Sequence, residues 1–187
     1  MSFKLKTYIW SKVAKDSNLS NMPGVDKDTD EKLSSEYVIG NLENLHNKVV
    51  DPIMRHFNSL PGSSGNSIGL TSCYRSKSVN AQVGGVENSQ HTHGMAVDIV
   101  YTEGESALVF NWAVANLSTW NQIIWEFPER GGMKSWVHVA YNQDDNKKTI
   151  SLASDREDLH EFYKNENTER RGIYTHGITL EADQTLI

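Results

Sequence analysis

The most informative segment of the chain reads Ser89-Gln-His-Thr-His-Gly-Met-Ala-Val-Asp98, and a second one follows it, Trp136-Val-His-Val139. Imidazole and carboxylate groups bind zinc, and a catalytic zinc site keeps three protein ligands and one open position. His91, Asp98 and His138 could supply these three ligands. Taken singly, each histidine could equally be an ordinary hydrogen-bonded or exposed residue, so the candidate metal site rests on all three together.

Both segments are predicted to form strands, over residues 95–101 and 136–141. Successive side chains of a strand point to opposite faces of the sheet, so Asp98 and His138 each lie on one defined face. Gly94 precedes the first strand and allows the turn that brings the upstream histidine to the same ion.

The rest of the chain mixes helices and strands at irregular intervals. Apolar residues recur at spacings of three and four over residues 37–57, which predicts an amphipathic helix that Pro52 ends or kinks. Further helices are predicted over residues 76–83 and 105–117, and further strands over residues 68–74 and 122–127. This order favours an α+β fold over a doubly wound parallel sheet.

Length and composition exclude several classes of protein. The 187 residues fit one domain, and the net charge of -6 argues against a nucleic-acid-binding face, which would be basic. The single cysteine, Cys73, excludes an internal disulfide framework, and we interpret it as a small buried apolar residue. Because no apolar run approaches the ~20 residues of a membrane span and the N-terminus lacks a signal-peptide core, we expect cytoplasmic synthesis without membrane insertion.

Four blocks of the sequence resemble one enzyme family. The pattern Ser-x-His-x-x-Gly-x-Ala-x-Asp at residues 89–98 resembles the first zinc motif of the M15 metallopeptidases, and residues 136–139 resemble the second. Residues 71–80 are similar to the Ser-Gly-Tyr-Arg-Ser segment of the family, and residues 122–127 resemble a block of its bacterial and phage branch. The resemblance implies a Hedgehog/DD-peptidase-like fold, with a small antiparallel sheet flanked by helices.

The same resemblance assigns roles to residues. It implies that Zn²⁺ is the cofactor and that His91, Asp98 and His138 are its ligands. Arg75 corresponds to the arginine of this family that binds a substrate carboxylate or carbonyl. The planar guanidinium group suits this role, because its N–H donors have a fixed geometry. Ser89 is expected to contact substrate or, alternatively, to cap a turn.

The general base is less clear from the sequence. Many family members carry Asp or Glu three residues before the last histidine, where this chain has Ser135. Glu126 is the candidate we choose instead, because it alternates with Trp125 and Phe127; if those two side chains fill the core, Glu126 faces the site. Apolar neighbours should raise its pKa, which suits proton transfer near neutrality. The alternative is that Glu126 is a solvent-exposed residue at a strand edge. Trp136 is expected to line the substrate cleft.

These assignments predict a zinc peptidase that hydrolyses amide bonds in peptidoglycan peptides, either as a carboxypeptidase or as an endopeptidase. We expect a monomer, encoded by a phage, that reaches the cell wall after release from the cytoplasm or as part of a virion. Within a single domain, residues 1–36 form an N-terminal arm, residues 37–145 the zinc peptidase core, and residues 146–187 a polar C-terminal extension.

Two alternatives remain open from the sequence. One is a non-catalytic, zinc-containing module of the same fold that binds a cell wall or sits in a virion, which the serine at position 135 favours. The other is a non-haem iron enzyme, since two histidines and a carboxylate also form its facial triad. That triad commonly has one residue between histidine and carboxylate, whereas six separate His91 from Asp98.

Overall fold

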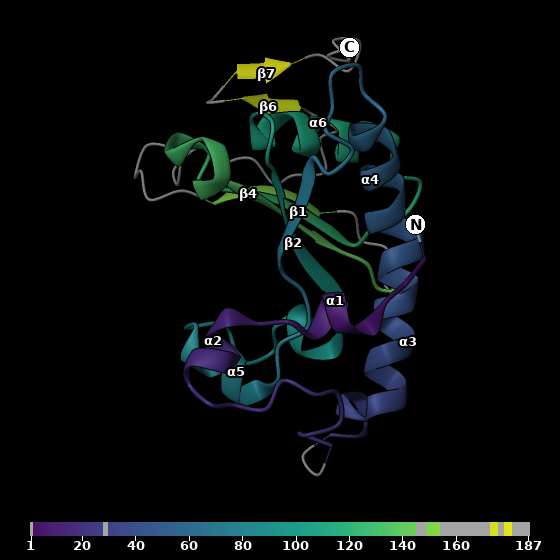
Figure 1. The fold of residues 1–187 in the computed structure, drawn as a ribbon, viewed down its shortest axis with the longest axis vertical. Coiled ribbons are helices and arrows are strands. Elements are labelled where there is room, and N and C mark those ends of the chain that lie inside the picture. The colour runs from purple at the N-terminus through teal and green to yellow at the C-terminus, as the bar shows by residue number, and fades with distance from the viewer. Residues whose placement is uncertain (1, 28–29, 145–148, 154–172, 176–177, 181–187) are drawn as a thin grey trace.

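A five-stranded sheet organises the computed structural model, which describes residues 2–27, 30–144, 149–153, 173–175 and 178–180 (Figure 1). Its strands are β1 (Ile68–Ser72), β2 (Ala96–Tyr101), β3 (Gln122–Glu126), β4 (Trp136–Ala140) and β5 (Thr149–Ala153). They lie in the order β1-β2-β4-β3-β5, and the first four pair antiparallel to their neighbours. The α+β class and the four predicted strands are confirmed.

β5 makes the sheet mixed, because it pairs parallel to β3. The sequence does not predict this strand, which falls in the segment interpreted as a polar extension. Ile150 is buried, and Ile150 and Leu152 alternate with Thr149 and Ser151. This alternation covers only a short stretch of an otherwise polar segment, so it is a weak signal for a strand. A separate antiparallel pair joins β6 (Ile173–Thr175) to β7 (Ile178–Leu180).

A long helical rod covers one face of the sheet (Figure 1). It consists of α3 (Ser35–Leu45), a π-helical turn (His46–Val50) and α4 (Asp51–Asn58), which confirms the helix predicted over residues 37–57. Pro52 lies in the first turn of α4, directly after the π-helical turn. Proline has no backbone N–H, so it cannot make the helical hydrogen bond to the residue four positions earlier. The wider π-helical turn before it accommodates this missing bond, and the rod continues.

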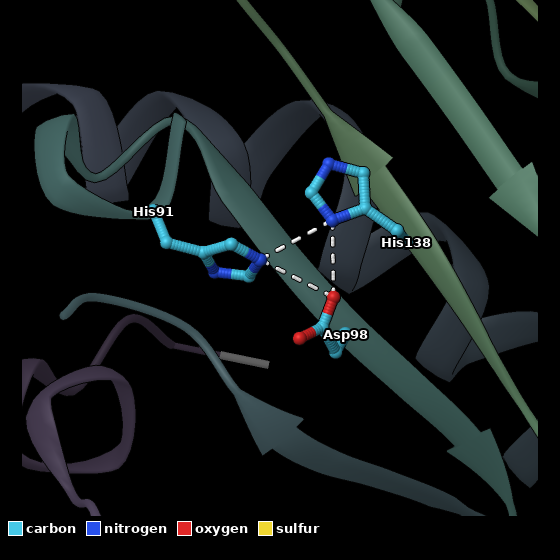
Figure 2. Close-up of side chains that lie close together, drawn as sticks. All are labelled: His91, Asp98 and His138. Carbon is cyan, nitrogen blue, oxygen red and sulfur yellow. Dashed lines mark hydrogen bonds and ion pairs between the residues drawn. The ribbon is translucent and has the colours of Figure 1, made fainter. Parts of the chain in front are cut away.

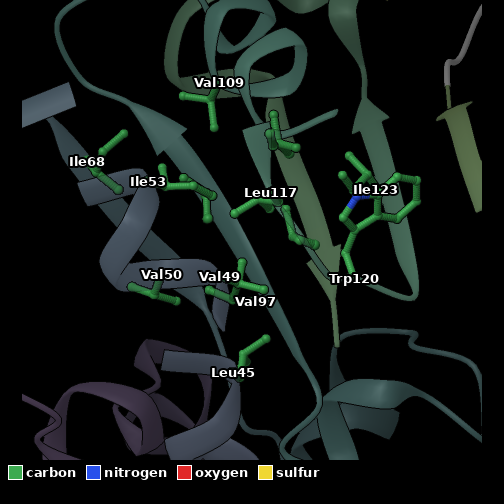
Figure 3. Close-up of a cluster of buried hydrophobic side chains, with 14 of the residues drawn as sticks. Leu45, Val49, Val50, Ile53, Ile68, Val97, Val109, Leu117, Trp120 and Ile123 are labelled. Atoms are coloured by element: carbon green, nitrogen blue, oxygen red, sulfur yellow. The ribbon is translucent and has the colours of Figure 1, made fainter. Parts of the chain in front are cut away.

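The hydrophobic core lies between this rod, helix α6 (Ser106–Asn116) and the face of the sheet that the rod covers (Figure 3). The strand residues in the core alternate along each strand: Val97, Ile99, Tyr101, Ile123, Trp125, Val137 and Val139. Strand alternation sends the residues between them to the opposite face. That second face therefore carries Asp98, His138 and Glu126.

Among the described residues, the other helical elements are short. They are α1 (Leu5–Ile9), α2 (Lys12–Asp16), α5 (Lys77–Gln82) and the 3-10 turns Glu31–Leu33, Gln90–His93, Pro128–Arg130 and Gly132–Lys134. Helix α5 confirms the helix predicted over residues 76–83, and the Ser76 hydroxyl accepts a hydrogen bond from the Val79 N–H at its start. Cys73 is buried, as predicted. Among the described residues, no helix has the length and apolar character needed to cross a membrane.

Candidate metal centre

Three side chains converge on one point above the second face of the sheet (Figure 2). His91 Nε2 lies 3.3 Å from Asp98 Oδ1, His138 Nδ1 lies 3.0 Å from the same oxygen, and the two nitrogens are 3.2 Å apart. Ligand atoms about 2.0–2.1 Å from a tetrahedral zinc ion lie ~3.3 Å from one another. The spacing of these three atoms is therefore that of three corners of a zinc tetrahedron.

Sheet pairing places two members of the group. Asp98 of β2 and His138 of β4 are direct cross-strand partners, so their side chains share a face. His91 arrives from the 3-10 turn Gln90–His93, which Gly94 ends with a left-handed φ of 70°. A Cβ atom on Gly94 would lie 2.7 Å from the Val38 carbonyl oxygen, so glycine is required there both for conformation and for space.

A backbone carbonyl fixes the orientation of the His91 ring. His91 Nδ1 lies 2.6 Å from the Cys73 carbonyl oxygen, and since a carbonyl only accepts, Nδ1 is the donor. The proton on Nδ1 leaves Nε2 with a free lone pair that faces Asp98 and His138. A metal-binding histidine is held in this way by a partner on its second nitrogen. This role of the Cys73 carbonyl was not predicted, because no spacing signal in a sequence marks a backbone contact across 18 positions.

The charges within the group also suit a divalent cation. Burial raises the pKa of the Asp98 carboxyl, but the adjacent His91 and His138 outweigh burial and hold that pKa well below its usual range. Burial lowers the pKa of His91, which keeps the imidazole neutral and able to bind metal. An ionised carboxylate beside neutral imidazole is the donor set that zinc takes in proteins.

Arg75 lies beside this group, directly after β1. Its side chain is only 16% exposed, and its Nη2 lies 4.0 Å from Asp98 Oδ2. Among the described residues its Nε has no hydrogen-bond partner, although that atom is buried. A buried guanidinium with an unused donor next to the metal group can hold an oxygen of a bound ligand.

Glu126 ends β3 on the same face as His138, whose cross-strand partner is Ile124. Burial is the largest cause that raises the pKa of Glu126, and the Asp98 charge adds to it. His138, a hydrogen bond with Trp136 and Arg75 act in the opposite direction without cancelling the rise. The glutamate is thus a half-buried carboxyl on the same face of the sheet as the candidate metal group, a position that suits an acid–base group.

The condition set for Glu126, that Trp125 and Phe127 both fill the core, holds for Trp125 and not for Phe127. Trp125 is buried and packs against Phe110, but Phe127 has a left-handed φ of 53° that ends the strand alternation. Its ring packs instead against Trp136 at 5.0 Å, and the Arg130 guanidinium lies over it. Glu126 keeps its place on the site face because the alternation holds up to that residue.

Ser135 occupies the position where many family members carry a carboxylate. It is 1% exposed, its hydroxyl accepts a hydrogen bond from Trp125 Nε1 at 2.9 Å, and it donates to the Glu126 carbonyl oxygen at 3.1 Å. The serine therefore joins the ends of β3 and β4, directly behind Glu126. Trp136 pairs with Glu126 across the two strands, on the site face.

Ser89 and His93 lie next to the metal group without joining it. The Ser89 hydroxyl accepts from the His91 N–H at 3.4 Å and so caps the 3-10 turn, which is the alternative that the sequence left open. His93 Nδ1 contacts Thr92 Oγ1 and the Ser89 carbonyl, and Asn41 donates to the His93 carbonyl oxygen. The contacts of both residues support the shape of the loop that presents His91.

The chain matches the model of a known protein family. Residues 32–140 match the family model described as Peptidase M15, and this segment contains every side chain of the candidate centre. No curated protein matches the chain.

Proposed function

Because the chain belongs to the peptidase M15 family, whose members are metal-dependent peptidases, we propose that it hydrolyses amide bonds in peptidoglycan peptides with Zn²⁺ as its cofactor. His91, Asp98 and His138 are the proposed ligands. The observation that carries the proposal is the convergence of three candidate ligand atoms within 3.3 Å of one another, with the proton of His91 held away on its other nitrogen.

The metal, when bound, supplies Lewis-acid polarisation of a carbonyl group and lowers the pKa of water. Glu126 is the proposed general base: it accepts the proton of the attacking water and returns it to the leaving amine. Its raised pKa brings it closer to the pH at which both transfers are efficient. Arg75 orients the substrate through a carboxylate or carbonyl oxygen, and Trp136 fixes the Glu126 carboxylate by a hydrogen bond and walls the cleft.

We also propose that the enzyme acts on the cell wall as a monomer, in the setting of phage lysis or of a virion. The support is the resemblance of residues 122–127 to a block of the bacterial and phage branch of the family. A carboxypeptidase cleaves a terminal bond and an endopeptidase an internal one. The masses of the products distinguish the two.

The test is incubation of the purified protein with peptidoglycan sacculi, with and without a chelator, followed by mass spectrometry of the released fragments. We expect new peptide ends only without chelator; loss of one terminal residue identifies a carboxypeptidase, and separation of cross-linked stems identifies an endopeptidase. Glu126→Gln should lose this activity while it keeps the metal. A wild-type protein with zinc bound that releases nothing from several wall types would contradict the proposal and favour the non-catalytic binding module.

A further inference from the structure

The N-terminal arm reaches the backbone that carries Arg75. Arg75 lies in residues 73–76, an irregular segment between β1 and α5 that belongs to no helix or strand. The backbone N–H and C=O groups of such a segment need partners from elsewhere in the molecule. The arm supplies several of them.

One side chain of the arm, Asn21, spans the Arg75 position from both sides. Its Nδ2 donates to the Tyr74 carbonyl oxygen at 3.0 Å and to the Ile9 carbonyl oxygen at 2.9 Å, and its Oδ1 accepts from the Ser76 N–H at 2.7 Å. The Tyr74 carbonyl and the Ser76 N–H belong to the two peptide groups that flank Arg75. The amide therefore pairs with this segment as a neighbouring strand would.

The orientation of the Asn21 amide is set by its partners. A flipped amide would place its oxygen against the two carbonyl oxygens and its NH₂ group against an N–H. Asn21 is 8% exposed, so water does not readily replace these bonds. The arrangement makes full use of the two donors and one acceptor, and neither aspartate nor alanine can reproduce it.

Other backbone contacts fix the same segment. The Tyr8 carbonyl accepts from the Tyr74 N–H at 3.0 Å, and the Ser20 carbonyl accepts from the Ser76 hydroxyl at 2.8 Å. On the other side, the Arg75 N–H donates to the His91 carbonyl oxygen at 3.1 Å. The Arg75 backbone is thus held between the arm and the loop of a proposed metal ligand, while helix α2 of the arm lies against α5 (Figure 1).

We propose that Asn21 is a positioning residue that acts through Arg75, and that it sets the direction in which the guanidinium meets a substrate oxygen. The proposal rests on the proposed function, because Arg75 is there the group that orients substrate. Asn21 precedes residue 32, where the match to the family model begins, so this control of Arg75 comes from outside the matched segment. Small displacements of an orienting group are costly, since a shift of about 1 Å can lower a rate by ~100-fold.

The test is a double-mutant cycle on the wall peptide that the wild type cleaves. We expect Asn21→Ala to lower kcat/KM about tenfold, mainly through KM, with unchanged metal content. In the Arg75→Ala background the same change should alter kcat/KM less than about twofold, because the residue through which Asn21 acts is gone. Additive losses in the two backgrounds would overturn the proposal.

Two further variants separate positioning from simple packing. Asn21→Asp keeps the size of the side chain but loses both donors, so it should lose as much activity as Asn21→Ala; near-wild-type activity would show that only space filling matters. Asn58→Ala is the matched control, because Asn58 accepts a hydrogen bond from the Ser67 N–H in another irregular segment, away from the site. Its kcat/KM should stay within about twofold of wild type in both backgrounds.

A measurement without activity keeps the inference separate from the proposed function. If the wild type cleaves no wall peptide, the proposed function fails, but the NMR signal of the Arg75 Nε–H group still reports its side-chain order. We expect one sharp signal in the wild type and in Asn58→Ala, and a signal in Asn21→Ala that is broadened or moved to the position of exposed arginines. The same sharp signal in Asn21→Ala would refute the positioning role.

Discussion

Ser135→Ala is the substitution whose cost follows most directly from the structure. It removes a hydroxyl that is 1% exposed and that joins the Trp125 indole N–H to the Glu126 carbonyl. Each buried polar group left without a partner costs about 1–3 kcal/mol. The two hydrogen bonds of the hydroxyl together give about 2–6 kcal/mol. Because the Glu126 carbonyl oxygen has a second lone pair, we expect a loss in the lower half of this range, about 2–4 kcal/mol in the free energy of unfolding.

Thermal unfolding measures this loss. For a chain of this size, 1 kcal/mol shifts Tm by about 2–4 °C, so Ser135→Ala should lower Tm by about 4–16 °C. Ser59→Ala is the matched control, because the exposed Ser59 hydroxyl donates only to the His56 carbonyl. A surface substitution of this kind should stay within about 0.5 kcal/mol of wild type.

A double-mutant cycle with Trp125→Phe tests the cause. Trp125→Phe removes the indole donor, so in that background Ser135→Ala no longer loses the hydrogen bond from Trp125 and should cost about 1–2 kcal/mol less. A loss for Ser135→Ala below about 0.5 kcal/mol would refute the argument that the hydroxyl joins the two strand ends. Additive losses in the cycle would refute the role of the Trp125 hydrogen bond in particular.

Three further predictions concern the metal and the dependence on pH. His138→Ala should abolish tight zinc binding while Glu126→Gln spares it, and equal metal loss in both, measured on the purified proteins, would contradict the assigned roles. Because the pKa of Glu126 is raised, the acid limb of kcat/KM should lie above pH 4.5, the ordinary value for glutamate, and an acid limb below it would count against Glu126 as the base. Hydrogen bonds from Ser64 and Ser67 lower the pKa of Glu103 to about 2, so its ionised form stabilises the fold above pH 4.5, and this contribution disappears as the pH falls toward 2. Denaturant titrations should therefore show wild type more stable than Glu103→Gln at pH 6 but not at pH 2, and an equal difference at both would exclude this linkage.

The candidate metal group was predictable because its signals are local or follow from alternation. The ten residues that end at Asp98 contain both the turn and the first two candidate ligands, and strand alternation places His138 on a definite face. The structure brings these side chains together through the direct pairing of Asp98 with His138. Sequence spacing alone did not reveal that pairing, since strand order is decided by long-range packing.

The failures have equally specific causes. Phe127 departs from the predicted alternation because it adopts a left-handed conformation that is uncommon for a bulky residue. β5 was not expected because the alternation of Ile150 and Leu152 with polar residues is short and lies in an otherwise polar segment, and its parallel pairing with β3 leaves no local signal. Asn21 gave no signal because its partners, Tyr74 and Ser76, lie more than 50 positions away.

The packing around Ser135 explains why the acidic group of the site lies on Glu126. The Ser135 side chain points toward Trp125, on the core side of the strand end, where it is almost fully buried. A carboxylate placed there would lose hydration and face the Glu126 carbonyl oxygen, an arrangement that is costly without a paired charge. A neutral hydroxyl satisfies both neighbours instead, and the acidic group lies on Glu126, one strand away and on the face of the metal group. The absence of a carboxylate at position 135 is therefore what this packing requires, and it does not by itself argue for loss of catalysis.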